Sequence, residues 1–137
     1  MAFNFYEGVT LQQFQKIESE VGPFYYYNTS LLRQTLDAIR KELSATPHFH
    51  VHYAIKANAN PELLTLVRKA GLGVDCVSGG EVQRALEVGF APTGIVFAGV
   101  GKSDKEIYHA LKLGIEAFNC ESLQEIYVIN EMAHVHG

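Results

Sequence analysis

Apolar residues follow two alternating patterns along this chain: a spacing of three or four residues, and short uninterrupted stretches. Between residues 29 and 46, leucine and isoleucine return every three or four positions, which predicts a helix with one apolar side that ends before Pro47. Shorter apolar stretches at 50–56, 72–76, 95–98 and 115–118 are typical of strands, and each is followed by a new helical stretch. Strands and helices therefore alternate from about residue 50 onward.

Residues typical of helix ends support this alternation. Asn60 followed by Pro61 indicates a helix start, and Ser78 and Ser103 each stand three residues before a glutamate, the spacing of a capping box. We expect Asn119 to cap the last helix in the same way. Three glycines stand where the preceding helices should end: Gly71, Gly89 and Gly114.

Strands that alternate with helices pair in parallel through right-handed crossovers, so the predicted fold class is α/β. An open doubly wound sheet, a TIM-like (β/α) barrel and a leucine-rich solenoid compete, but the solenoid's leucine–asparagine pattern is missing. Polar residues follow every strand, as they do at the mouth of a barrel, which favours the barrel. Four β/α units make only about its first half, so the strands at 50–56 and 115–118 should have unpaired edges. His134 and His136 should begin a further strand.

Composition narrows the possible functions. A chain of 137 residues suits one domain, and 11 basic against 15 acidic residues without a basic patch argue against nucleic acid as a partner. Neither a signal peptide nor a membrane span is recognisable, so we expect a cytoplasmic protein with no membrane partner. Cys76 and Cys120 form no metal-binding pair, and the alternating histidines at 48–52 lack acidic or cysteine partners. No metal is therefore expected.

The stretch HYAIKANAN places Lys56 at the end of an otherwise apolar strand. A buried ammonium costs free energy unless it is paired or loses its proton. At the carboxyl end of a barrel strand the lysine would point into the mouth, where a neutral amine can attack a carbonyl group. The alternatives are an ion pair with Asp75, or a side chain that extends to solvent.

Four stretches, YAIKANAN, GVDCVSGGEV, IVFAGVGKSDKEI and FNCES, resemble in this order the diaminopimelate decarboxylases of the alanine-racemase-like, fold type III group of pyridoxal-phosphate enzymes. The resemblance runs from about Pro23 to the end and corresponds to about the first third of a family member. It implies that residues 1–28 are an N-terminal segment, within which residues 23–28 form a strand joining a second domain. Residues 29–137 would be the N-terminal part of the cofactor-binding barrel, with the C-terminal β-domain outside this chain.

The same resemblance implies a lyase of lysine biosynthesis, which converts the amino acid meso-2,6-diaminopimelate to L-lysine and carbon dioxide. In this family Lys56 would bind pyridoxal 5'-phosphate as a Schiff base. Asp75 matches the acidic residue near that lysine and the cofactor. The full-length protein is expected to be a homodimer.

Several features of the family cannot be assigned to residues of this chain, among them the phosphate-binding loop and the acid that pairs with the ring nitrogen. We therefore expect the 137-residue chain to be inactive by itself. An amino-acid racemase, another basic amino-acid decarboxylase and a non-catalytic pyridoxal-phosphate-binding half-barrel remain alternatives. Ser78 and Glu81 should act as a helix cap that supports the loop after Asp75. Lys102 lies in a P-loop-like triplet, but Val96 replaces the first glycine, so nucleotide binding is not expected.

Overall fold

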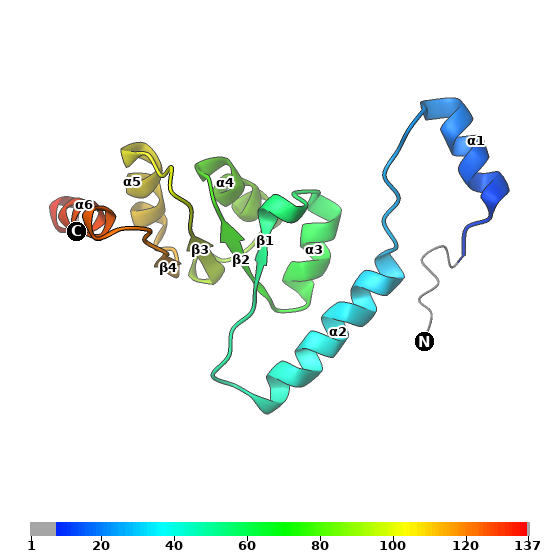
Figure 1. Ribbon diagram of the computed structural model, residues 1–137. Coiled ribbons are helices and arrows are strands. Elements are labelled where there is room, and N and C mark those ends of the chain that lie inside the picture. The colour runs from blue at the N-terminus through cyan, green and yellow to red at the C-terminus, as the bar shows by residue number, and fades with distance from the viewer. Residues whose placement is uncertain (1–7, 137) are drawn as a thin grey trace.

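The computed structural model describes residues 8–136. Its α-helices are α1 (Leu11–Val21), α2 (Thr29–Ala45), α3 (Pro61–Lys69), α4 (Gly79–Val88), α5 (Asp104–Leu113) and α6 (Leu123–His136). Its strands are β1 (His52–Ala54), β2 (Gly73–Cys76), β3 (Ile95–Phe97) and β4 (Ala117–Phe118), and two 3-10 turns are η1 (Ile55–Ala57) and η2 (Pro92–Gly94). The elements follow one another along an elongated molecule, from α1 at one end to α6 at the other (Figure 1).

The strands form a single parallel sheet in the order β1-β2-β3-β4. One row of paired residues crosses all four strands: Ala54, Asp75, Val96 and Ala117. Each strand is followed by a helix, so the predicted α/β fold with four β/α units is confirmed. The sheet does not close on itself, and β1 and β4 form its two edges, which makes it about half of a barrel.

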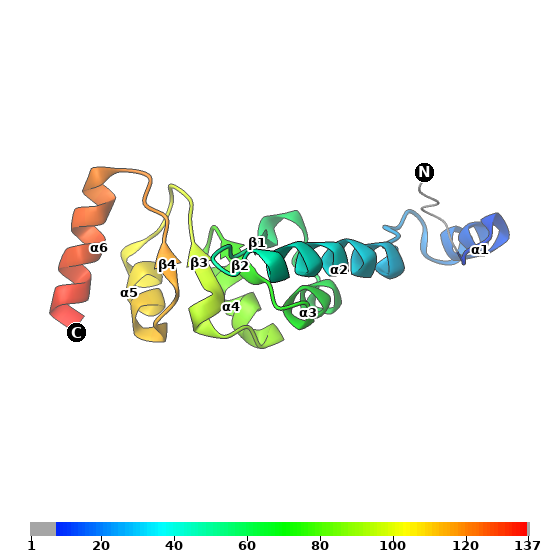
Figure 2. The same ribbon diagram turned by 90° about the horizontal axis from the view of Figure 1, so that it is seen from below.

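Helices cover one face of this sheet. Contacts run in sequence from α2 to α3, α4, α5 and α6, and Figure 2 shows α3 and α4 on the same side of the strands. Val74, Cys76, Ile95 and Phe97 point into this helical layer and are buried, whereas the residues between them are only half-buried. A parallel sheet is normally covered on both faces, so this alternation marks the second face as open.

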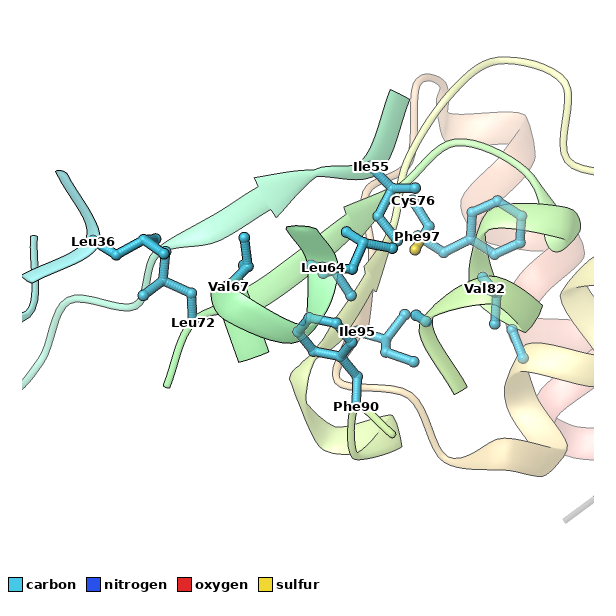
Figure 3. Close-up of a cluster of buried hydrophobic side chains, with 13 residues drawn as sticks. Leu36, Ile55, Leu64, Val67, Leu72, Cys76, Val82, Phe90, Ile95 and Phe97 are labelled. Carbon is cyan, nitrogen blue, oxygen red and sulfur yellow. The ribbon is translucent and has the colours of Figure 1, made fainter. Parts of the chain in front are cut away.

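The core lies between the sheet and the helices (Figure 3). Fully burying one such aliphatic or aromatic side chain contributes about 1.5–3 kcal/mol, so the helical face supplies most of the stability that holds the strands. The side chains drawn and labelled there include Leu36, Ile55, Leu64, Val67, Val82, Ile95 and Phe97.

The predicted caps of the central helices are confirmed. The Asn60 side chain accepts hydrogen bonds from the first turn of α3, and Ser78 and Ser103 stand at the N-caps of α4 and α5. Gly89 and Gly114 end their helices in the left-handed conformation, which favours glycine. These ends depend on residues within one helical turn, which is why sequence spacing locates them.

Two predicted strands are too long. The expected strand at 50–56 is limited to His52–Ala54, because the Asn58 N–H donates to the Ile55 carbonyl at 3.0 Å and turns the chain into η1. This turn directs Ile55 into the core, where it is fully buried. The expected strand at 115–118 begins only at Ala117, because the Ile115 N–H still caps α5 by bonding to the Ala110 carbonyl.

The predictions for the last helix were wrong in two respects. Asn119 does not cap α6, because its N–H donates to the Phe97 carbonyl at 2.9 Å and so continues the pairing of β4 with β3. The cap is formed instead by Ser122, whose hydroxyl accepts from the Glu125 N–H at 3.2 Å. His134 lies inside α6 and does not begin a strand.

The helix α1 was not predicted, although Thr10 and Gln13 form a capping box at its start. Its Phe14 ring packs edge-on against Tyr26 at 5.0 Å, and it stacks with Phe24 at 6.0 Å. Helix α1 projects away from the sheet on the far side of α2 (Figure 1). Residues 24–28 are extended without strand pairing in the described chain, so the joining strand at 23–28 stays a prediction, and residues 1–7 lie outside the described part.

Candidate active site

Lys56 lies at the carboxyl end of β1, in the η1 turn. Its neighbour Ile55 is fully buried and anchors the turn, whereas Lys56 itself is exposed. Asn58 completes the turn, and its side-chain oxygen accepts from the Asn60 N–H at 2.9 Å, which connects the turn directly to the start of α3. The backbone at Lys56 is therefore fixed on both sides, and only its side chain is free to reach a ligand.

Asp75 lies on β2, the strand that pairs with β1. It pairs in register with Ala54, two residues before Lys56, so both residues lie at the carboxyl ends of adjacent strands. The Oδ1 atom of Asp75 is buried and has no hydrogen-bond partner. Within the described chain, no hydrogen bond or ion pair joins Asp75 to Lys56, so the expected alternative of an ion pair is not formed.

An orphaned carboxylate oxygen is unusual, because buried polar atoms are almost always hydrogen-bonded. Its position at the carboxyl end of β2, with the unpaired Lys56 just after the end of the adjacent strand β1, fits a site that receives a positively charged or hydrogen-bonding group from a ligand. The residues present therefore fit pyridoxal phosphate, since Lys56 offers an amine for its aldehyde and Asp75 offers an acceptor beside it.

The loop after Asp75 is held by side chains of the helix that follows. The Ser78 hydroxyl accepts from the Glu81 N–H at 3.2 Å, and the Glu81 carboxylate accepts from the Val77 N–H at 2.7 Å. The predicted helix cap at Ser78 is confirmed. Glu106 of α5 adds a third constraint, because its carboxylate accepts from the Gly79 N–H at 2.6 Å. The carboxyl end of β2 is thus fixed by two helices.

Cys76 points away from this site, into the helical layer. Burial, followed by the negative charges of Glu81 and Asp75, raises the pKa of its thiol to about 12. A thiol with such a pKa stays protonated near neutral pH and is a poor nucleophile. Among the side chains of residues 8–135, no three His, Cys, Asp or Glu gather as a metal site would require.

The role of Lys102, which lies beyond the carboxyl end of β3, was not predicted from the sequence. It lies between β3 and α5, its side chain is completely covered, and its ammonium binds two backbone carbonyls and one carboxylate. An ammonium whose three donors are already used cannot also bind a phosphate. The only available signal was a lysine directly before a capping serine, which does not reveal such burial.

A cavity of about 370 Å³ lies at the opposite end of the strands, and neither Lys56 nor Asp75 lines it. Near it, the His52 ring lies 2.8 Å from the Glu116 carboxylate, which connects β1 to the segment before β4. His52 thus supports the amino-terminal end of the sheet. In the described part of the chain, no helix is both long and apolar enough to cross a bilayer.

The comparisons with known proteins agree with this geometry. Residues 30–136 match the family model described as pyridoxal-dependent decarboxylase, pyridoxal binding domain. The chain belongs to this family. The four-strand half-barrel is therefore the first part of the family's pyridoxal-binding barrel.

Relatives named diaminopimelate decarboxylase share much of the sequence. The protein from Bacteroides thetaiotaomicron is 57% identical over 111 residues, which cover 81% of this chain and 29% of the relative. The crystal structure of AQ1208 from Aquifex aeolicus superposes with a TM-score of 0.82 at 39% identity, covering 98% of this chain and 33% of that one. The crystal structure of diaminopimelate decarboxylase from Helicobacter pylori, complexed with L-lysine, superposes with a TM-score of 0.76 at 39% identity. The superposition covers 88% of this chain and 30% of that one. This chain thus spans about a third of the length of these relatives.

Proposed function

We propose that this chain is the N-terminal, pyridoxal-phosphate-binding part of a diaminopimelate decarboxylase. The observation that carries the proposal is the unpaired Lys56 at the carboxyl end of β1, together with the orphaned Asp75 oxygen at the carboxyl end of the adjacent strand β2. The substrate would be meso-2,6-diaminopimelate and the products L-lysine and carbon dioxide. Relatives that carry this name, one of them complexed with L-lysine, support the substrate class.

Lys56 would hold the cofactor. When bound, pyridoxal phosphate supplies an aldehyde that condenses with amines and a ring that takes up the electron pair left by a departing carboxylate. Lys56 presents a primary amine on a rigid turn, and it would bind the cofactor until the substrate's amine takes its place. Its exposure in the open half-barrel leaves the amine accessible to both partners.

Asp75 would provide a negative charge next to this amine. A carboxylate close to a nitrogen favours the protonated, positively charged form of that nitrogen. The orphaned Oδ1 atom has the capacity to accept such a proton in a hydrogen bond. Its strand position is fixed by Ser78 and Glu81, so Asp75 would hold the proton at one place in the mouth.

We further propose that residues 29–137 form the barrel part, and that residues 1–28 lead into it from a second, β-rich domain. The extended segment after Gly22 and the separate position of α1 support this division. The whole protein would act in the cytoplasm as a homodimer. By itself, the 137-residue chain is expected to show no turnover, because no residue in it is assigned to the cofactor's phosphate or ring nitrogen.

A covalent labelling experiment tests the role of Lys56. The protein is incubated with pyridoxal phosphate, reduced with borohydride, digested and examined by mass spectrometry. We expect one pyridoxyl label at Lys56, its loss in Lys56→Ala, and no change in Lys105→Ala, which removes another exposed lysine. A label spread over several surface lysines, or one that survives in Lys56→Ala at another position, would contradict the proposal.

A second assay separates the substrate classes in the full-length protein. Release of carbon dioxide from diaminopimelate is compared with release from ornithine and with racemisation of alanine. The proposal expects the first reaction and its loss in Lys56→Ala. Racemisation without release of carbon dioxide would assign the protein to the racemases, and a label at Lys56 without any turnover would make it a non-catalytic cofactor binder.

A further inference from the structure

The ammonium of Lys102, which lies between β3 and α5, is withdrawn from solvent, and its three donors are all used. Its Nζ lies 2.8 Å from the Gly99 carbonyl, 2.9 Å from the Asn119 carbonyl and 2.8 Å from a carboxylate oxygen of Glu125. Its side chain has 0% exposure. Removing a charge from water is costly, and it is tolerated here because each of the three N–H groups has an acceptor.

The acceptors of Lys102 belong to two different loops. Gly99 lies in the loop between β3 and α5, whereas Asn119 lies in the loop between β4 and α6. The Phe97 ring, with its centroid 5.7 Å from the ammonium, covers it from the side of β3. One side chain therefore ties together the carboxyl ends of two neighbouring strands.

Two glutamates reinforce this connection. The Glu121 carboxylate accepts from the Gly99 N–H at 3.3 Å, and the Glu125 carboxylate accepts from the Glu121 N–H at 2.7 Å. The hydrogen bond from Lys102, followed by that from the Glu121 N–H, lowers the pKa of Glu125, so the carboxylate is charged near neutral pH. The two loops are thus joined at both the N–H and the carbonyl of Gly99.

The joined loops rest on the strand that carries Asp75. The Ala98 N–H donates to the Cys76 carbonyl at 2.8 Å, directly after Asp75. Gly99 has a φ of +90°, and a Cβ added there would lie 3.3 Å from the Val77 Cβ atom, so the loop packs tightly over the end of β2. A shift of Gly99 would therefore be transmitted to the backbone next to Asp75.

We infer that Lys102 is a positioning residue that clamps the β3–α5 and β4–α6 loops into one rigid section of the active-site mouth. This role rests on the proposed function, because it concerns the mouth that would hold cofactor and substrate. The clamp makes no contact with the Lys56 amine. Its loss should therefore weaken substrate positioning more than attachment of the cofactor to Lys56.

Amide hydrogen exchange on the intact protein tests the clamp without any cofactor. Lys102→Met keeps most of the apolar stem and removes the ammonium, and Lys105→Met is the matched control because Lys105 is exposed at the start of α5. In Lys102→Met we expect exchange at residues 98–103 and 117–122 to be at least about tenfold faster, with α3 unchanged. Unchanged exchange in either loop, or equal acceleration throughout the molecule, would overturn the clamp.

The double variant Lys102→Met/Glu125→Gln separates clamping from charge balance. If Lys102 only neutralises Glu125, removing both charges restores the protection of the two loops. The clamp predicts that protection stays low, because the two carbonyls still lack their donor. Should Lys102→Met fail to fold, Glu125→Gln alone weakens the same cluster, and loop exchange no faster than in the wild type would then refute the proposal.

Kinetics on the full-length enzyme show whether the clamp serves the site. We expect Lys102→Met to keep the pyridoxyl label at Lys56 and to raise the KM for diaminopimelate about tenfold or more, since small displacements of positioning groups have large effects. Kinetic parameters equal to those of Lys105→Met would refute a role at the site. If the wild type takes no label at Lys56, the proposed function fails, whereas the exchange experiment still decides the clamp.

Discussion

Replacing Gly73 by alanine probes the packing of the amino-terminal end of the sheet. A Cβ at this position would contact the His52 ring, lying 2.6 Å from its Nε2 atom, and it would lie 2.8 Å from the Gly94 carbonyl oxygen. Overpacking of this kind costs about 1–3 kcal/mol. If the ring moves away, the 2.8 Å hydrogen bond from His52 to Glu116 is also lost, at about 0.5–1.5 kcal/mol. The free energy of unfolding should fall by about 1.5–4.5 kcal/mol in total.

Urea denaturation followed by circular dichroism measures this loss. Gly80→Ala is the control, because the nearest atom to its Cβ would be the Ser78 hydroxyl at 3.8 Å and alanine favours the helix by about 0.5–1 kcal/mol. His52→Ala/Gly73→Ala should recover part of the loss, since only the contact with Gly94 remains. A Gly73→Ala protein as stable as Gly80→Ala would refute the packing described here.

Two further predictions concern ionisation. The pKa of Glu106 is held below its usual 4.5, first by the Ser103 hydroxyl and then by the Ser103 and Gly79 N–H groups. Because the pKa of Glu106 is lower in the folded state, the stabilisation is complete above pH 4.5 and is lost as the pH falls through the folded-state pKa. In Glu106→Gln, the free energy of unfolding should therefore fall less between about pH 5 and 3 than in the wild type, as measured by urea denaturation at each pH. For the thiols, iodoacetamide at about pH 8 should modify the exposed Cys120 and spare the buried Cys76 in the native protein, and it should modify both in urea. A native protein with both cysteines modified at equal rates would contradict the burial of Cys76.

From α2 onward, the α-helices and strands and their order could be predicted from the sequence. Helix starts at Asn60, Ser78 and Ser103 could be predicted because a cap depends on atoms within one turn of the helix. The α/β class could be predicted because stretches with helical spacing of apolar residues alternate with short apolar stretches typical of strands, and this spacing depends on which side of each element is buried. The YAIKANAN stretch marked Lys56 through resemblance to a family, whereas spacing alone favoured an ion pair with Asp75 or a side chain that extends to solvent.

Features that depend on residues distant in the chain could be seen only in the folded molecule. Strand β1 ends at Ala54, because the chain turns there and buries Ile55 in a core that is formed by later elements. Helix α6 is capped by Ser122 and not by Asn119, because the Asn119 N–H pairs with β3.

The same holds for the side chains that shape the site. Neither the orphaned oxygen of Asp75 nor the burial of Lys102 could be predicted from the sequence, because both depend on strand register and on loops from separate β/α units. His52 meets Glu116 across 64 residues of sequence, and Gly73 is required because the His52 ring and the Gly94 carbonyl oxygen lie close to it. Local periodicity carries no information about such contacts, since they exist only after the strands have aligned.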